Sequence, residues 1–313
     1  MRIIFAACTL LALVVTAAHA EPDAPCATAG QNNSWLQIET IRLWPADAPQ
    51  ARGKECKDIP TLTIFASARA PDAVGPAVVV LPGGAYTHLA ANHEGRQVAD
   101  WFTSHGFTAF LLQYRLSSDG YLLPVPLLDA RRAIQTVRAR AKEYRIDPNR
   151  IVVVGFSAGG HLAALSAVQP LPGDPAAHDP IERVSSRPDY LVLGYPWIGA
   201  ISSDTSHLSY CQLVNVMDRC EQLRKAYSPD LFVTERTPPT FWWHTFDDQT
   251  VPVEQGLRFY EALVKAGVPS EAHVFAHGWH GTGLGSGDLS LEQWPPLLEM
   301  WLRAQGLLAG GGK

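Results

Sequence analysis

The stretch IVVVGFSAGGH, Ile151–His161, decides how this chain folds. Its β-branched start predicts a short strand that is buried on both faces of a sheet. The next residues follow the G-x-S-x-G pattern of a nucleophile elbow, in which Ser157 occupies a sharp strand-to-helix turn. Small neighbours let the two backbones approach closely. Leu162–Ala167 then predicts a buried helix, whose N-terminal N–H groups lie beneath the serine.

Strands and helices alternate along the rest of the chain. Apolar runs predict further strands at 37–44, 61–66, 77–81, 107–114, 190–195, 240–244 and 271–276. Helical periodicity predicts helices at 92–105, 127–144, 253–266 and 291–307. This order favours an α/β fold with a mostly parallel sheet, whose sites lie at the carboxyl ends of the strands. Residues 197–238 show no clear period and predict an insertion over that edge.

A glycine-containing loop follows the predicted strand 77–81. Its sequence is Pro82-Gly83-Gly84-Ala85-Tyr86. A loop of the type His-Gly-Gly-Gly at this point supplies backbone N–H groups to a negatively charged oxygen. Here Pro82 replaces the histidine and Ala85 replaces the third glycine, but a main-chain N–H remains at Ala85. A donor can therefore remain in this loop, and the N-terminus of the helix after Ser157 offers further unpaired N–H groups.

A nucleophilic serine needs an imidazole base and a carboxylate that orients it. Asp247 and Asp248 follow the predicted strand 240–244, and His277 and His280 follow the predicted strand 271–276. Either member of each pair satisfies the order serine, acid, histidine. Asp248 lies deeper in its loop and His280 is flanked by a glycine, so the preferred triad is Ser157, Asp248 and His280.

Metal chemistry is a poor alternative for these histidines. His273, His277 and His280 have no acidic ligand at a helix-compatible spacing, and the HExxH arrangement is absent from the sequence. We expect no metal and no other cofactor.

The N-terminus and the overall charge indicate where the protein works. Arg2, an apolar run and Ala18-His19-Ala20 predict a secretory signal peptide over residues 1–20. Residues 21–60 then form a leader and edge segment, and 61–313 form the main domain. The formal net charge of the 313 residues is −5, and no basic patch indicates a nucleic-acid or membrane partner. We expect an exported protein, either periplasmic or secreted.

Four cysteines remain after the signal peptide. In an exported chain this even number allows two disulfides with three possible connectivities. Proximity in the sequence favours Cys26–Cys56 and Cys211–Cys220.

Together these motifs resemble the α/β-hydrolase esterases of the acetylxylan-esterase and feruloyl-esterase-like group. The resemblance extends from about Ala77 to Leu302. It rests on the stretches 81–86, 94–101, 114–116, 129–138, 147–148, 155–162, 248–252 and 280–284. It implies a nucleophilic role for Ser157, an orienting role for Asp248 and a base role for His280. It also implies oxyanion donors at Gly84, Ala85 and Ala158.

The resemblance implies a serine esterase that removes O-acetyl groups from plant polysaccharide such as xylan or xyloglucan. Tyr86, Trp197 and Trp279 are candidate sugar contacts, because aromatic faces stack on pyranose rings. Trp242 and Trp243 fit the buried core equally well. The alternatives are a general short-chain carboxylesterase, a feruloyl esterase, a peptidase of the same fold and a non-catalytic carbohydrate-binding relative. Small esters are the expected partners; the oligomeric state stays open.

Overall fold

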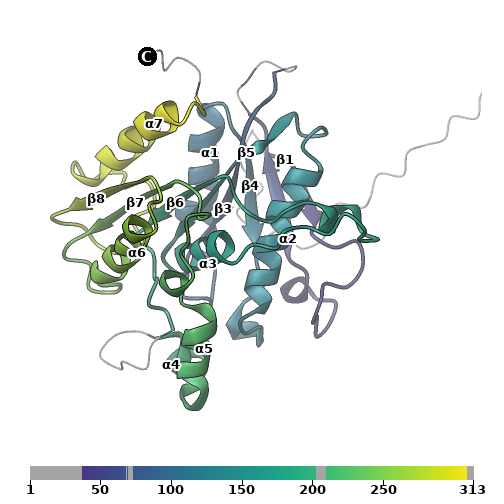
Figure 1. Cartoon of the computed structure of the whole chain (residues 1–313), viewed down its shortest axis with the longest axis horizontal. Helices are drawn as coiled ribbons and strands as arrows, with labels where there is room; N and C mark the ends of the chain where they lie inside the picture. Colours follow the sequence, from purple (N-terminus) through teal and green to yellow (C-terminus); the bar gives the residue numbers. More distant parts are fainter. Residues whose placement is uncertain (1–36, 68, 70–72, 202–208, 309–313) are drawn as a thin grey trace, which may run out of the picture.

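An eight-stranded sheet organises the molecule (Figure 1). The computed structural model describes residues 37–67, 69, 73–201 and 209–308. The strand order is β1-β2-β4-β3-β5-β6-β7-β8, with antiparallel pairing of β1 with β2 and of β2 with β4, and parallel pairing elsewhere. The strands are β1 Gln37–Arg42, β2 Thr61–Phe65, β3 Gly75–Leu81, β4 Thr108–Gln113, β5 Ile146–Phe156, β6 Tyr190–Gly194, β7 Thr240–Thr245 and β8 Ser270–Phe275. The predicted mostly parallel α/β architecture is confirmed.

Helices cover both faces of the sheet (Figure 1). They are α1 Gln97–Ser104, α2 Val125–Ala139, α3 Ser157–Val168, α4 Tyr210–Leu213, α5 Cys220–Tyr227, α6 Glu254–Lys265 and α7 Trp294–Ala304. The apolar residues of α2, α3 and α6 pack in one buried cluster, and those of α1 and α7 pack in another. Val153 of β5 belongs to the first cluster, whereas Val152 and Val154 belong to the second. The elbow strand is therefore apolar throughout because each face meets its own core.

Two elements differ from the sequence-based prediction. The segment predicted as one helix over 92–105 is a π-helical turn, Ala91–Arg96, followed by α1. Strand β5 begins at Ile146, where a turn was predicted, because Ile146 pairs with Gly75 before an irregularity in the register with β3. Both differences arise from tertiary contacts that local periodicity does not encode.

The insertion predicted over residues 197–238 contains the two short helices α4 and α5. Figure 1 shows them projecting away from the sheet. A disulfide joins Cys211 of α4 to Cys220 of α5. The carbonyl of Tyr227, at the end of α5, lies 2.8 Å from Nε2 of His161 in the first turns of α3. The insertion thus contacts the carboxyl edge of the sheet beside the elbow.

Two predictions fall partly or wholly outside the described residues. The signal peptide 1–20 lies in the part of the chain that is not described, and so does Cys26 of the predicted Cys26–Cys56 pair. Both stay predictions. Within the described ranges, no helix is long and apolar enough to cross a membrane.

Candidate active site

The elbow places Ser157 at the carboxyl end of β5 in a strained conformation. Its φ angle is +50°, in the left-handed region, while Phe156 before it is extended. The neighbouring glycines are required by close contacts. A Cβ on Gly155 would lie 2.3 Å from the Gly159 carbonyl oxygen, and a Cβ on Gly159 would lie 2.1 Å from the Leu81 carbonyl oxygen. The G-x-S-x-G pattern therefore reflects packing of α3 against β3 and β5.

One aspartate and one histidine meet this serine. His280 Nε2 lies 2.7 Å from Ser157 Oγ, and His280 Nδ1 lies 2.7 Å from Asp248 Oδ2. A carboxylate only accepts hydrogen bonds, so Nδ1 carries the imidazole proton and Nε2 is free to accept the hydroxyl proton. The three residues come from the loops after β5, β7 and β8, at one edge of the sheet.

The surroundings of Asp248 keep its carboxylate ionised. Burial alone would raise the pKa of this carboxyl, but hydrogen bonds from His244 and His280 hold its pKa well below the usual range. The N–H groups of Thr250 and Val251 donate to Oδ1 at 2.9 Å each. An ionised and fixed carboxylate of this kind orients the imidazole and stabilises its cation.

The two alternative residues form a separate pair. His277 Nδ1 lies 3.0 Å from Asp247 Oδ2, and 85% of the His277 side chain is exposed. Asp247 Oδ1 also accepts the Gly278 N–H at 2.9 Å. Asp247 thus ties the loop after β7 to the loop after β8, whereas Asp248 and His280 reach Ser157.

The predicted oxyanion loop follows β3 beside the elbow. Gly83 cannot serve as a donor there, because its N–H bonds to Oε2 of Glu94 at 2.7 Å. The Gly84 carbonyl accepts from the N–H groups of Thr87 and His88. Among the described residues, no hydrogen bond occupies the N–H of Gly84, Ala85 or Ala158. These are the three donors that the sequence predicts, and Ala158 belongs to the first turn of α3.

The predicted sugar contacts separate into two groups. Tyr86 and Trp197 are buried, with at most 1% of their surface exposed. The Tyr86 hydroxyl lies 2.7 Å from His161 Nδ1, and the backbone N–H of Trp197 donates to the Ser157 carbonyl. The structure therefore places both residues in the packing around the elbow and not at an open surface. Only Trp279 is available for contact, with 61% exposure.

His161 lies beside the elbow in α3, and the sequence-based prediction did not include it among the site residues. Because its Nε2 faces the Tyr227 carbonyl, Nε2 carries the proton, and Nδ1 accepts from the Tyr86 hydroxyl. Burial lowers the pKa of His161 to about 4, so the ring is neutral at neutral pH. Its adjacency to the elbow glycines was the only signal in the sequence.

Metal ligands do not gather in the part of the chain that the structure describes. No group of three or more His, Cys, Asp or Glu residues there could hold an ion. His273, one of the three histidines considered, lies 2.8 Å from Glu271 in β8.

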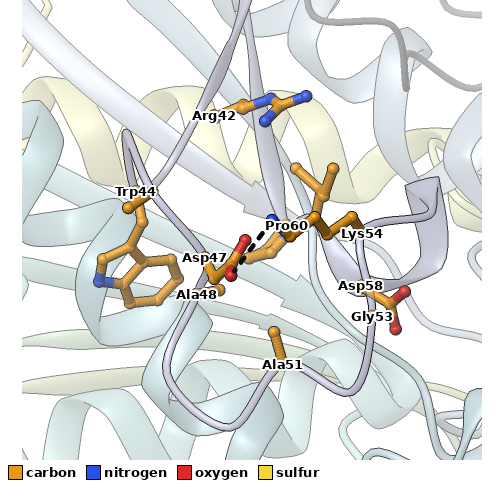
Figure 2. A pocket seen from close by; sticks show the side chains of 11 residues that line it. Arg42, Trp44, Asp47, Ala48, Ala51, Gly53, Lys54, Asp58 and Pro60 are labelled. Atoms are coloured by element: carbon orange, nitrogen blue, oxygen red, sulfur yellow. Dashed lines mark ion pairs between the residues drawn. The ribbon is translucent and has the colours of Figure 1, made fainter.

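A hollow that is separate from the triad lies in the N-terminal segment (Figure 2). It has a volume of about 180 Å³ and is lined by residues from Arg42 to Pro60, including Trp44. Lys54 Nζ and Asp47 Oδ2 form an ion pair at 4.0 Å, which Figure 2 draws as a dashed line. No residue of the triad lines this hollow.

The fold and this site define a class of protein. Two protein-family models match the chain, BD-FAE over residues 62–172 and the prolyl oligopeptidase family over residues 191–302. The chain belongs to the α/β-hydrolase esterases of the acetylxylan-esterase and feruloyl-esterase-like group. The resemblance inferred from the sequence motifs is thereby confirmed.

Two solved structures of esterases are similar to this chain in sequence and in fold. The acetyl ester-xyloside bifunctional hydrolase of Caldicellulosiruptor lactoaceticus is 40% identical, with a TM-score of 0.76 over 87% of this chain and 97% of that one. A thermophilic esterase of Thermogutta terrifontis with bound propionate is 29% identical, with a TM-score of 0.69 over 81% and 92%.

A curated relative is the acetylxylan esterase of Xylanibacter ruminicola, which is 32% identical over 74% of this chain. The match covers 46% of that protein, so the chain spans about half the length of the curated relatives it matches.

Proposed function

We propose that this protein is an exported serine esterase that removes O-acetyl groups from plant polysaccharide such as xylan, or from its oligosaccharides. The observation that carries the proposal is the chain of contacts from Ser157 through His280 to Asp248, at 2.7 Å for each contact. The acetylxylan-esterase and acetyl ester-xyloside relatives support the choice of substrate.

The geometry supports a two-step mechanism. Ser157 Oγ attacks the ester carbonyl while His280 Nε2 takes the hydroxyl proton. The carbonyl oxygen becomes negatively charged, and the N–H groups of Gly84, Ala85 and Ala158 stabilise it. His280 then gives the proton to the sugar oxygen as its bond to the carbonyl carbon breaks, so the sugar leaves as a free hydroxyl and an acyl-enzyme remains. Water, activated by the same imidazole, releases acetate and restores the serine.

The first experiment compares the wild type with Ser157→Ala on p-nitrophenyl acetate, butyrate and octanoate. We expect rates that fall with acyl length, and a loss of kcat/KM of roughly 10⁴-fold or more in the variant. Ser166→Ala is the matched control, because Ser166 is buried in the same helix and, among the described residues, its hydroxyl donates to the Leu162 carbonyl of that helix. The control should keep its activity.

Three results would change the proposal. A preference for octanoate would favour a lipid esterase. Cleavage of prolyl peptide substrates would favour a peptidase, which the prolyl oligopeptidase match over 191–302 makes worth testing. Wild-type activity that exceeds neither Ser157→Ala nor the uncatalysed rate on any ester would exclude the serine mechanism and leave a binding protein. Labelling of Ser157 by a fluorophosphonate checks the same point without a substrate.

The exposed aromatic rings beside the triad support a sugar substrate. Phe246 precedes the acid loop and Trp279 precedes the base, with 70% and 61% exposure respectively. The Asp247 contacts to His277 and Gly278 hold their two loops together. Exposed aromatic faces next to a catalytic centre suit the stacking of pyranose rings.

Substitution of Trp279 separates sugar recognition from ester chemistry. Trp279→Ala should lower kcat/KM on acetylated xylo-oligosaccharides by about tenfold or more, because one ring stack is lost. On p-nitrophenyl acetate the same variant should stay within twofold of the wild type. Met300→Ala, which truncates an exposed apolar side chain on α7, is the control. Equal losses on both substrates would remove the sugar contact from the proposal.

A further inference from the structure

Glu94 is a buried carboxylate next to the site that the mechanism has not used. It lies in the π-helical turn Ala91–Arg96 and is 2% exposed. Its two oxygens accept hydrogen bonds from different parts of the site. Oε2 accepts the Gly83 N–H at 2.7 Å, and Oε1 accepts the Tyr195 hydroxyl at 2.7 Å. Burial of a charge is costly unless such bonds satisfy it. The carboxylate is therefore held in a fixed place by these two bonds.

Tyr195 extends the connection to the loop that carries the base. Because the carboxylate only accepts, the Tyr195 hydroxyl donates to Glu94 and keeps a lone pair for the Gly283 N–H at 2.9 Å. The Tyr195 ring also packs edge-on against the His280 ring, with 4.9 Å between centroids. Tyr195 is 1% exposed, so water does not compete for these bonds.

We propose that Glu94 is a positioning residue that fixes the oxyanion loop and the His280 loop relative to one another. The inference rests on the proposed esterase function and deepens it. Glu94 holds Gly83, which leaves Gly84 and Ala85 to face the reacting oxygen. Through Tyr195 it holds Gly283, three residues after the base. Gly83 lies between this carboxylate and the nucleophile. A Cβ added to Gly83 would lie 2.6 Å from Glu94 Oε2 and 2.9 Å from Ser157 Cβ, so both groups pack against this glycine.

This role predicts a loss of transition-state stabilisation and not of substrate binding. Gly84 and Ala85 meet a full negative charge only in the tetrahedral state, so an error in their position lowers kcat while KM stays nearly constant. In Glu94→Gln the amide has one acceptor oxygen, and its NH₂ group faces one of the two donors. We expect kcat on p-nitrophenyl acetate to fall by roughly 10- to 100-fold, with KM within about threefold.

A transition-state analogue gives a second readout. A trifluoromethyl ketone forms a hemiketal with an activated serine and places its oxyanion among the same N–H donors. Its inhibition constant should rise in Glu94→Gln by the same factor by which kcat/KM falls. A purely structural role would lower the fraction of active enzyme but leave the inhibition constant of that fraction unchanged, and this result would overturn the proposal.

A double-mutant cycle tests the path through Tyr195. Tyr195→Phe removes the hydrogen bond to the Gly283 N–H but keeps the bond between Glu94 and the Gly83 N–H. We expect it to lower kcat by about tenfold. The double variant with Glu94→Gln should lose little more than Glu94→Gln alone, because both changes break one connection. Losses that multiply would contradict a shared path. Tyr144→Phe is the matched control, since the Tyr144 hydroxyl has no partner among the described residues.

Hydrogen exchange tests the tie without any enzymatic activity. Peptides that cover 82–90 and 279–287 should both exchange faster in Glu94→Gln, and only the second should do so in Tyr195→Phe. Unchanged exchange in both loops of Glu94→Gln would overturn the positioning role. Absence of Ser157-dependent activity in the wild type would instead overturn the proposed function, and the exchange result would still decide whether Glu94 joins the two loops.

Discussion

At the scale of single residues, the oxyanion loop carries non-glycine residues at backbone angles that glycine adopts more easily. Ala85 has φ +53° and Tyr86 has φ +62°, both in the left-handed region. An L-residue other than glycine pays roughly 1–2 kcal/mol for this conformation. The loop keeps it because Glu94, Thr87 and His88 bond to the two glycines before Ala85. The N–H of Ala85 is thereby held in place for a developing charge.

Substitution at Ala85 tests whether this conformation matters. Ala85→Gly keeps the N–H and accepts the left-handed φ, so kcat/KM should stay within about threefold of the wild type. Ala85→Val places a β-branched residue where it is a genuine outlier, and the loop must rearrange. We expect a loss of roughly 10²-fold in kcat, comparable to the loss of one oxyanion donor. Full activity of Ala85→Val, with an unchanged melting temperature, would show that catalysis does not depend on the left-handed backbone conformation at this position.

The residues of the site were predictable to different degrees. Order and spacing predicted Ser157, one of two aspartates and one of two histidines, because these follow strands that must end at the same edge. Local sequence supported only a preference for Asp248 over Asp247 and for His280 over His277, from loop position and a flanking glycine. That choice depends on which loop turns inward. Glu94 was hidden for a similar reason, since it lies in a turn that local periodicity predicts as an ordinary helix.

At the scale of elements, the strands were predictable, but the helices within the insertion were not. Apolar runs of five or six residues predict strands such as β3 and β7 without help from the rest of the fold. Helices α4 and α5 have four and eight residues, too few to show a period or to be stable alone. Contacts with the rest of the fold hold them in place. For example, the Leu123 N–H donates to the Tyr210 hydroxyl of α4 at 2.8 Å.

The disulfide between α4 and α5 should therefore contribute much of their stability. Cys211 and Cys220 are nine residues apart, and closing a loop of this length stabilises a fold by about 2–3 kcal/mol in the chain-entropy account. Replacement of both cysteines by alanine should lower the free energy of unfolding by about that amount in urea titrations. Trypsin should also cut within 210–227 sooner than in the wild type. Unchanged cleavage there would mean that packing alone holds the two helices.

At the scale of the whole molecule, the site unites the two halves of the chain. Ser157 and the oxyanion loop lie in the half matched by BD-FAE, and Asp248 and His280 lie in the half matched by the prolyl oligopeptidase family. The bond from Tyr195 to Glu94 joins the halves again beneath the surface. The charges of the site must consequently influence the stability of the entire domain.

Asp248 makes that influence measurable through pH. Its pKa is depressed in the folded protein below the ordinary 3.8, so the ionised carboxylate stabilises the fold at neutral pH. This stability is lost as the pH falls below about 4 toward the folded pKa. Asp248→Asn cannot ionise, and its NH₂ group must oppose either the N–H donors of Thr250 and Val251 or the imidazole donors on the other oxygen.

We expect Asp248→Asn to be less stable than the wild type at pH 7, and the difference in unfolding free energy to shrink at pH 3. Urea titrations of both proteins at pH 7, 4 and 3 measure this difference. The wild type should lose more stability on acidification, because only its folded state resists protonation at position 248. A difference that is the same at all three pH values would mean that the Asn variant perturbs the loop sterically. The ionised bond network around Asp248 would then contribute nothing to folding, although it could still orient His280.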